Sequence, residues 1–338
     1  MKLKNISLMN VFMCFCVIII HITSYPIENS EIDKTWVLIL FCINEFLRFA
    51  VPCFVFLSGY KLYRRYKNEK IDIKKFYFGR LKKIVIPYII CYIIYFFYFY
   101  NKGWIGFPDF MRGLVTGRMA AHFYYVIFTI QLYILFPLIL ILFEKNSNLT
   151  LAISCLSTII MNQVISFKYD YLIFVTWILY FVFGMYVAKY EKEKVNKKAF
   201  VFELLGFSIL SIFMVYINYK TEVLKEISIY YPPLLILCSI FASVFFLNLF
   251  KIITSKEHKA LEAIVNFFDP NTYYIFLYHV FFIEITQFDI IHAHLNTPKT
   301  VFLGQILIVF WAIMIMCVIL NFGRKMLKKA KNEVFIRN

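Results

Sequence analysis

Charged residues are scarce in this sequence: Asp, Glu, Lys and Arg make up 17% of its 338 residues, while hydrophobic residues make up 62%. This scarcity excludes an ordinary soluble domain and predicts a protein whose solvent is the lipid bilayer. Acidic residues are the scarcer sign, so the formal net charge is +16. Nucleic-acid binding is excluded as the reason for this charge, because 40 Phe and 25 Tyr lie in apolar runs of membrane-spanning length.

Several motifs of soluble enzymes are missing as well. The sequence contains no Gly-rich phosphate loop, no GxSxG, no HExxH and no acidic pair suited to glycoside hydrolysis. Its eight cysteines fall within apolar runs and form no CxxC pair, so neither disulfide bonds nor a metal site is predicted. No internal repeat is evident, which argues against a transporter built from inverted halves.

Long hydrophobic runs are what the sequence does contain. Because a membrane-spanning helix needs about twenty apolar residues, the runs predict an all-α polytopic membrane protein with about ten transmembrane helices. The predicted spans are residues 6–24, 35–60, 84–101, 122–143, 149–166, 172–189, 199–219, 231–253, 272–292 and 300–322. Residues 1–322 are thus predicted to form one transmembrane domain and residues 323–338 a basic cytoplasmic tail. The loop 102–121 is a candidate re-entrant or interfacial segment.

Basic residues are divided unevenly between the two sides of these spans. With the N-terminus inside, 27 of the 36 Lys and Arg fall in inner segments and 8 in outer loops. Because cytoplasmic loops carry the excess of Lys and Arg, both termini are predicted to be cytoplasmic. Residues 61–83 form the most basic loop and are a candidate dock for a polyanion, while the tail is predicted to lie against anionic lipid.

Three ionisable residues are expected to meet inside the membrane. At 1.5 Å per residue, His21 lies about 24 Å along the first helix, and Glu45 lies at a similar depth on the second, so the two can face each other. Arg48, one turn deeper, can reach a carboxylate or an incoming anion. A histidine beside a carboxylate is a workable general base, because the carboxylate fixes its tautomer and stabilises the imidazolium. The alternative is a structural polar pair between helices.

The other histidines carry less specific predictions. His279 is expected about 12 Å into the ninth helix from the inside, where it either contacts substrate or packs as a hydrogen bonder between helices. His122 is expected at the outer surface, at the start of the fourth helix. There it is a candidate for contact with an acceptor, as is Tyr125 close by, or is simply solvated.

Short motifs along nearly the whole chain make it recognisable. They comprise residues 17–21, 48–54 with 58–60, 80–83 with 86–88, 122–125 with 131–133 and 137, 180–184, and 275–279. In this order they resemble the acyltransferase-3 family of integral membrane acyltransferases, which includes bacterial surface-polysaccharide O-acetyltransferases. Within the family the sequence looks closest to the group containing the poly-N-acetylglucosamine intercellular-adhesion membrane protein.

The resemblance implies a multi-pass protein of the bacterial cell membrane that moves an acyl group, usually acetyl from cytoplasmic acetyl-CoA, to a sugar hydroxyl outside the membrane. It implies that His21 is catalytic and that the family's inner Arg-x-x-Arg motif, here Arg80 and Lys83, serves acyl-CoA. Two positions depart from the family pattern. Many members carry Arg eleven residues before the histidine, where this chain has Asn10, and the second Arg of the inner motif is Lys83.

These positions together predict a mechanism without a metal. The phosphates of acetyl-CoA or another acyl-CoA bind residues of the inner side, and the pantetheine arm reaches His21. The candidate donor-binding residues are Arg80, Lys83, Arg64, Arg65 and Asn10. His21, oriented by Glu45, deprotonates the hydroxyl or briefly carries the acyl group, and Arg48 stabilises the oxyanion. For the basic loop, simple positive-inside anchoring is the alternative.

Two other classes of function remain open from the sequence. One is an exporter of polysaccharide or lipid-linked sugar, since ten spans with an internal polar stripe also suit transport. The other is a scaffolding subunit of a synthase complex. The expected partners are membrane lipid, a saccharide acceptor and other proteins of surface-polysaccharide biosynthesis, with no nucleic acid.

Overall fold

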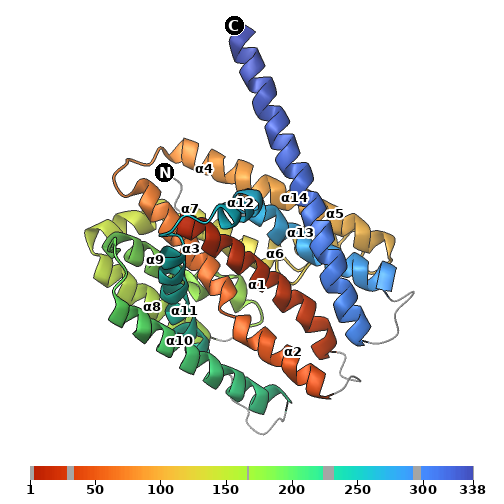
Figure 1. The fold of residues 1–338 in the computed structure, drawn as a ribbon, viewed down its shortest axis with the longest axis horizontal. Coiled ribbons are helices and arrows are strands. Elements are labelled where there is room, and N and C mark those ends of the chain that lie inside the picture. The colour runs from red at the N-terminus through yellow and green to blue at the C-terminus, as the bar shows by residue number, and fades with distance from the viewer. Residues whose placement is uncertain (1–3, 29–33, 166, 224–231, 292–297, 338) are drawn as a thin grey trace. The chain divides into compact units, whose positions relative to one another are not determined.

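The computed structural model describes residues 4–28, 34–165, 167–223, 232–291 and 298–337. Every regular element within these ranges is helical, which confirms the predicted all-α class. Seven helices of the described chain are long and apolar enough to cross a membrane, so the prediction of a polytopic membrane protein is confirmed as well. The chain divides into two compact units, residues 1–44 with 254–338, and residues 45–253 (Figure 1).

The first unit is built around α1 (Lys4–Glu28). This helix contacts α12 (Lys259–Phe268), α13 (Thr272–Ile285) and α14 (Pro298–Arg337), with the short turns η5 (Asp269–Asn271) and η6 (Thr286–Ile291) on either side of α13. The first part of α2 (Lys34–Leu47) joins α1 through Asn44, whose amide donates to the Ile20 carbonyl and the Thr23 hydroxyl at 2.8 Å each. Such bonds satisfy polar groups that the bilayer cannot.

The second unit holds the other helices. In chain order they are α3 (Ala50–Tyr66), α4 (Ile73–Arg80), η1 (Leu81–Val85), α5 (Ile86–Asn101), α6 (Asp109–Thr116), α7 (Tyr124–Lys145), α8 (Ser147–Gln163), η2 (Asp170–Leu172), η3 (Phe174–Thr176), α9 (Ile178–Tyr190), α10 (Lys197–Asn218), η4 (Tyr219–Val223) and α11 (Pro232–Ile253). The closest packing is between α3 and α9, where Gly59 lies against the backbone of Phe181 and Gly184 against that of Phe56. Small residues at a crossing let two membrane helices approach closely.

The predicted second span is not one regular helix. It breaks between Leu47 and Ala50, and α2 and α3 lie on either side of the break. Pro52 explains the position, because its ring cannot donate a backbone hydrogen bond and clashes with the carbonyl four residues earlier, that of Arg48. Arg48 therefore sits at a turn rather than on a straight helix face.

Three other predicted spans are shorter helices in the structure. α8, α9 and α13 have 17, 13 and 14 residues. In the second and third of these runs, tighter or wider turns occupy part of the predicted length: η2 and η3 precede α9, and η6 follows α13. A continuous apolar run does not reveal such turns, because they change the backbone hydrogen bonding and not the hydropathy.

The loop 102–121 folds back along α5. The Tyr92 hydroxyl donates to the carbonyl of Phe110 at 2.6 Å, and the Tyr88 hydroxyl donates to the carbonyl of Leu114 at 2.8 Å. α6 thus runs antiparallel to α5, from the end of that helix towards its beginning. The loop's predicted re-entrant or interfacial character stays a prediction, while its return along α5 carries the start of α7 into the interior of its unit.

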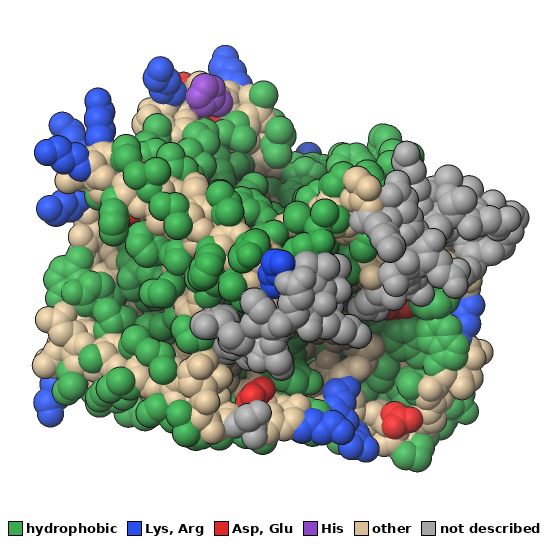
Figure 2. Space-filling model, turned by 90° about the horizontal axis from the view of Figure 1, so that it is seen from below, with side chains coloured by type: hydrophobic (Ala, Val, Ile, Leu, Met, Phe, Trp, Pro, Cys, Tyr) green, Lys and Arg blue, Asp and Glu red, His purple; other side chains and the backbone are tan. Residues whose placement is uncertain are grey.

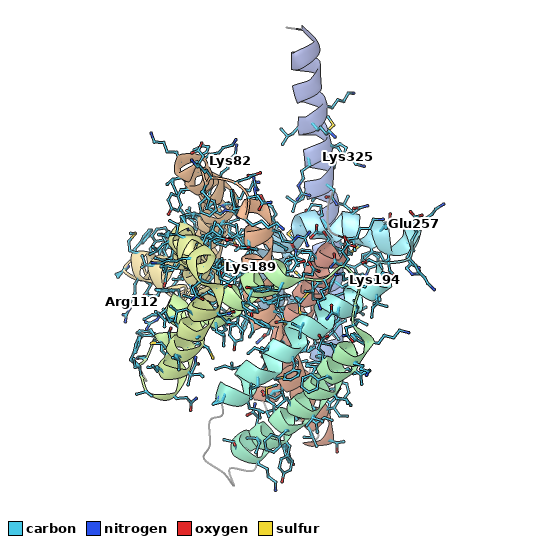
Figure 3. The ribbon with its side chains drawn as sticks, turned by 90° about the vertical axis from the view of Figure 1, so that its left-hand side faces the viewer. Lys82, Arg112, Lys189, Lys194, Glu257 and Lys325 are labelled. Atoms are coloured by element: carbon cyan, nitrogen blue, oxygen red, sulfur yellow. The ribbon has the colours of Figure 1, made fainter. Side chains whose placement is uncertain are left out.

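The predicted basic tail continues the last span. α14 passes through residues 322 and 323 as one helix, and its last turns, which carry Lys325, extend beyond the other helices of its unit (Figures 1 and 3). Arg324 donates to the side-chain oxygen of Asn271 at 2.5 Å and to the carbonyl of Pro270 at 3.1 Å. The first basic residue of the tail is thus tied to η5, directly before α13.

Hydrophobic side chains dominate the surface. On the face shown in Figure 2 they form a nearly continuous cover, and most Lys and Arg lie at its margins. Figure 3 shows the labelled Lys189 in the last turn of α9 and Lys194 in the loop between α9 and α10. This distribution is expected of helices that face lipid along their length and water at their ends.

Candidate functional site

Two histidines of the first unit meet. The rings of His21 on α1 and His279 on α13 are 5.1 Å apart between centroids, and their planes are inclined by 54°. The expectation that the two lie at different depths is therefore wrong. His279 is fully buried, whereas His21 is partly exposed. Of this histidine pair, His21 is the less buried member.

The offset between α1 and α13 explains why the histidines meet. The Ser7 hydroxyl donates to Asp269 at 2.9 Å, and the Asn10 amide donates to Asp269 at 3.1 Å and to the Thr272 hydroxyl at 2.8 Å. α13 therefore starts beside the second and third turns of α1 and not beside its first residues. This offset removes most of the difference in depth that equal starting levels predicted.

The same contacts place Asn10 at the interface that α1 forms with η5 and α13. Its amide is part of a polar cluster with Asp269, Ser7 and Thr272 that joins α1 to η5 and α13. Its predicted role in donor binding stays a prediction. Sequence reasoning missed Asp269, although an acidic residue directly before the apolar run that begins at Thr272 was an available signal.

His279 is held by its own helix. Its Nδ1 lies 2.7 Å from the carbonyl oxygen of Phe276 and 3.1 Å from that of Ile275. A carbonyl oxygen can only accept, so Nδ1 carries a proton and donates. The ring is therefore fixed in position and in tautomer, which favours the interpretation of His279 as a packed, hydrogen-bonded side chain over that of a substrate contact.

Glu45 and Arg48 form an ion pair in the second unit. Arg48 Nη2 lies 2.5 Å from Glu45 Oε1, and the Asn218 amide donates to Oε2 of the same carboxylate. Glu45 is 1% exposed, while 36% of the Arg48 side chain is exposed. Of the two alternatives for Arg48, a carboxylate or an anion, the structure shows the carboxylate. The pairing of Glu45 with His21 stays a prediction.

Arg80 occupies an unusual position at the end of α4. Its guanidinium lies over the rings of Phe76 and Tyr133, at 5.1 and 5.2 Å from their centroids, which are cation–π contacts. Its Nε is buried and has no hydrogen-bond partner among the described residues. The π-helical turn η1 follows immediately, and such turns are frequent at functional sites.

A groove of about 590 Å³ opens beside Arg80, between α4, η1 and α7. Apart from Arg80, the described residues that line this Arg80 groove are aliphatic or aromatic, among them Leu81, Ile84 and Ile130. Lys83, the second basic residue of the inner motif, is exposed on η1. A cation in an apolar groove, with further positive charge nearby, is chemically suited to an anion that carries an apolar arm.

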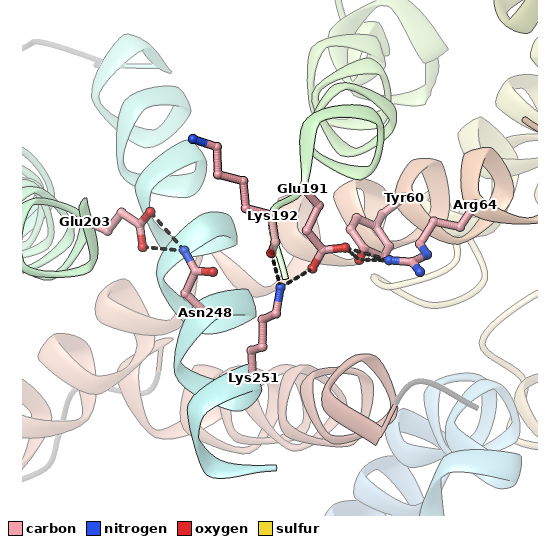
Figure 4. A network of polar contacts seen from close by, with 7 residues as sticks. All are labelled: Tyr60, Arg64, Glu191, Lys192, Glu203, Asn248 and Lys251. Atoms are coloured by element: carbon pink, nitrogen blue, oxygen red, sulfur yellow. Dashed lines mark hydrogen bonds and ion pairs between the residues drawn. The ribbon is translucent and has the colours of Figure 1, made fainter. Parts of the chain in front are cut away.

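Arg64 belongs to a different cluster (Figure 4). It donates to the Glu191 carboxylate at 2.6 Å and to the Tyr60 hydroxyl at 3.2 Å. Lys251 donates to the same carboxylate at 3.1 Å and to the Lys192 carbonyl at 2.5 Å. This Glu191 network joins α3, the end of α9 and α11, so Arg64 has a structural task in addition to its predicted one.

The remaining candidate for donor binding, Arg65, is exposed. Its guanidinium lies 5.3 Å from the ring centroid of Tyr66. In that position its charge remains accessible to a phosphate. Of the basic residues predicted to bind the donor, Arg65 and Lys83 are thus exposed, and Arg80 lines the groove.

The expectation that His122 lies at the outer surface is wrong. His122 is 2% exposed, and its ring centroid is 6.1 Å from that of Tyr95 on α5 and 4.5 Å from that of Phe123. The return of α6 along α5 carries this part of the chain inward. Tyr125 is half-buried, with its ring 5.2 Å from that of Phe128.

Metal ligands do not gather anywhere in the described ranges: no group of three or more His, Cys, Asp or Glu side chains there could hold a metal ion. The histidine pair offers imidazoles for acid–base chemistry, and the Arg80 groove offers a cation for anion binding.

One comparison with known proteins gives a match. A protein family described as an acyltransferase domain matches residues 3–322 of the chain. No curated protein and no solved structure matches. The matched range includes the histidine pair, the Glu45–Arg48 ion pair and the Arg80 groove.

Proposed function

Since the chain belongs to the acyltransferase-3 family of integral membrane acyltransferases, we propose that it moves an acetyl group from cytoplasmic acetyl-CoA to a saccharide hydroxyl. The acceptor is a saccharide of the cell surface or one attached to a lipid carrier, and the protein resides in the bacterial cell membrane. Membership of the family makes the chain a membrane acyltransferase; the donor, the acyl group and the acceptor are the proposal.

The observation that carries the proposal is the histidine pair. A neutral imidazole is the usual general base at neutral pH, and transfer to a hydroxyl requires that a proton be taken from it. His21 is partly exposed and is backed by a second imidazole. A structural histidine packed between helices would have no need of an accessible side.

The proposal that acyl-CoA is the donor rests on the Arg80 groove. Acyl-CoA presents phosphates at one end and an uncharged pantetheine arm with the thioester at the other. Arg80 and the exposed Lys83 and Arg65 offer the positive charge, and the aliphatic lining of the groove suits the arm. Arg64 contributes less in this proposal, because Glu191 already neutralises it.

The reaction proceeds by attack of the hydroxyl on the thioester. His21 removes the hydroxyl proton while the oxygen bonds to the carbonyl carbon. The negative charge that develops on the carbonyl oxygen needs a donor or a cation, and Arg48 is proposed for that task because part of its side chain is exposed. The carbon–sulfur bond then breaks, and the proton passes to the sulfur of CoA.

Mass spectrometry of surface glycans tests the function. Cells that carry the chain are compared with cells that lack it and with cells that carry His21→Ala or the control His258→Ala, an exposed histidine at the start of α12. We expect glycans heavier by acetyl groups with the native chain and with the control, and unmodified glycans with His21→Ala. The amount of inserted protein is measured for each strain.

Three results would contradict the proposal. If His21→Ala inserts normally and leaves glycan acetylation unchanged, His21 is not the base. If cells without the chain accumulate intact polymer inside and lose it from the surface, the chain is an exporter. If alanine at both His21 and Arg48 changes neither glycan mass nor export, it is a scaffold.

A further inference from the structure

His279 is placed to act on His21 rather than on a substrate. Its ring is fully buried, and the partly exposed ring of His21 lies in front of it at 5.1 Å between centroids. The carboxylate that the sequence suggests for orienting His21, that of Glu45, is held by Arg48 and Asn218. Within its own unit, His21 meets the ring of His279 on α13.

The backbone of α13 fixes which nitrogen of His279 is basic. Because Nδ1 donates to the carbonyl of Phe276, the neutral ring has its lone pair on Nε2. Histidines that act in catalysis or bind metals are commonly fixed in the same way, by a hydrogen bond from one ring nitrogen to a carbonyl or carboxylate. His279 thus presents a single defined acceptor atom.

The distance between the rings suits a shared proton. A hydrogen bond between two ring nitrogens spans about 2.9 Å, and each nitrogen lies about 1 Å from its ring centroid, so the centroids lie about 5 Å apart. The observed 5.1 Å agrees with this value. The inclination of 54° differs from the parallel planes of stacked rings.

Two carboxylates of the surrounding elements are bound away from His21. On α12, Glu262 pairs with Lys4, and in η5, Asp269 binds Ser7 and Asn10, both nearer the beginning of α1 than His21 is. The other titratable or charged side chains described on α1, α12, α13 and α14 are Cys14, Cys16, His258, Lys259, Tyr273, Tyr274, Tyr278, Glu284, Cys317, Arg324, Lys325, Lys328 and Lys329.

We propose that His279 is the positioning residue of His21: the His21 ring turns so that one of its N–H groups donates to Nε2 of His279, which leaves the opposite nitrogen of His21 as the base. This inference rests on the proposed acyl transfer. That opposite nitrogen takes the proton of the acceptor hydroxyl as the new carbon–oxygen bond forms, and His279 stabilises the resulting imidazolium. When the carbon–sulfur bond breaks, the same nitrogen gives its proton to the sulfur of CoA.

Substitution of His279 by two amides of different length distinguishes its contact with Phe276 from its contact with His21. In His279→Gln the side-chain oxygen reaches the position of Nε2 and can still accept from His21. In His279→Asn the amide reaches only the position of Nδ1, so it keeps the bond to Phe276 and loses the contact with His21. Both substitutions place a neutral amide in the same buried site, which makes each a control for the other.

The kinetic test uses the full-length protein in lipid nanodiscs and follows release of the CoA thiol from acetyl-CoA in the presence of the identified acceptor. We expect His279→Asn to lower kcat by roughly tenfold or more with little change in the KM for acetyl-CoA. We expect His279→Gln to retain much of the native kcat. Glu45→Gln, which leaves the histidine pair intact, has a smaller effect on kcat than His279→Asn.

A second measurement needs no substrate. Diethyl pyrocarbonate modifies neutral imidazoles, so the rate of His21 modification, followed by mass spectrometry across pH, reports the protonation of His21. An acceptor at His279 stabilises protonated His21, and its loss in His279→Asn moves the midpoint of the modification curve to lower pH. His279→Gln, which retains an acceptor, stays closer to the native midpoint.

The outcomes separate this inference from the proposed function. If native protein transfers no acyl group but the modification midpoint shifts as described, the histidine pair is real and the assigned reaction is wrong. If native protein is active and both variants match it in kcat and midpoint, His279 does not position His21. Equal loss in Asn and Gln variants, in proportion to a fall in Tm, assigns His279 to packing alone and overturns the inference.

Discussion

Glu45 and Arg48 lie on either side of the same helix end and are joined at 2.5 Å between Oε1 and Nη2. The two partners differ in burial, since Glu45 is 1% exposed and the Arg48 side chain is 36% exposed. The pair is therefore asymmetric: an unpaired Arg48 can be solvated, while an unpaired Glu45 cannot.

Neutralising the two partners is expected to have unequal effects. Arg48→Gln removes the cation from a buried carboxylate that Asn218 also binds, and it is expected to lower the free energy of unfolding by about 3–5 kcal/mol. Glu45→Gln is expected to lower it by about 1–3 kcal/mol. Unfolding in detergent by denaturant measures both, and the double variant should lose less than Arg48→Gln alone. Equal losses in the two single variants would contradict the asymmetry.

The crossing of α3 and α9 depends on glycine at two positions. A Cβ at Gly59 would overlap the backbone of Phe181, and a Cβ at Gly184 would overlap that of Phe56. We therefore expect Gly59→Leu and Gly184→Leu to prevent accumulation of folded protein. Gly79→Ala is the control, because nothing lies within 4 Å of the added carbon, and alanine in a helix is favoured over glycine by about 1 kcal/mol. Fluorescence-detected size-exclusion chromatography reports the folded fraction.

Arg80 should matter for the donor and not for folding. If the Arg80 groove binds acyl-CoA, Arg80→Ala raises the KM for acetyl-CoA by about tenfold or more, because a charge-assisted contact of about 1.5–3 kcal/mol is lost. Arg80→Lys retains the charge without the planar stacking on Phe76 and Tyr133, so we expect an intermediate KM. Lys82→Ala, an exposed neighbour, is the control. An unchanged KM in Arg80→Ala would place the donor elsewhere.

The sequence predicts the class of the fold because bilayer chemistry leaves few choices. Apolar runs of spanning length and the excess of Lys and Arg on one side follow from the cost of exposing polar backbone and charge to lipid. These signals do not report breaks inside a run. The interruption at Arg48 and the π-helical turn after Arg80 depend on local backbone geometry, of which only Pro52 leaves a mark in the sequence.

The candidate site shows the same limit. His21 could be named from its surroundings in the sequence, since a histidine in an apolar run is rare, and Arg80 from the resemblance of its motif to that of the family. The contact between His21 and His279 could not, because it depends on where α13 begins relative to α1. That offset is determined by Ser7, Asn10 and Asp269, which lie far apart along the chain. The burial of His122 likewise follows from the path of α6.

The position of Asn10 yields a prediction that separates structure from donor binding. Many members of the family have arginine where this chain has Asn10, and here the amide binds Asp269 and Thr272. Asn10→Leu removes both bonds and leaves the Asp269 carboxylate with fewer donors, so we expect a loss of about 1–3 kcal/mol in the free energy of unfolding.

An arginine at this position would face the same carboxylate and form an ion pair with it. We therefore expect Asn10→Arg to retain stability, measured by Tm in detergent, and to leave the KM for acetyl-CoA within about twofold of the native value. If Asn10→Leu instead raises that KM strongly while the Tm stays constant, Asn10 acts on the donor. The cluster around Asp269 would then be part of the donor site and not a joint between α1 and α13.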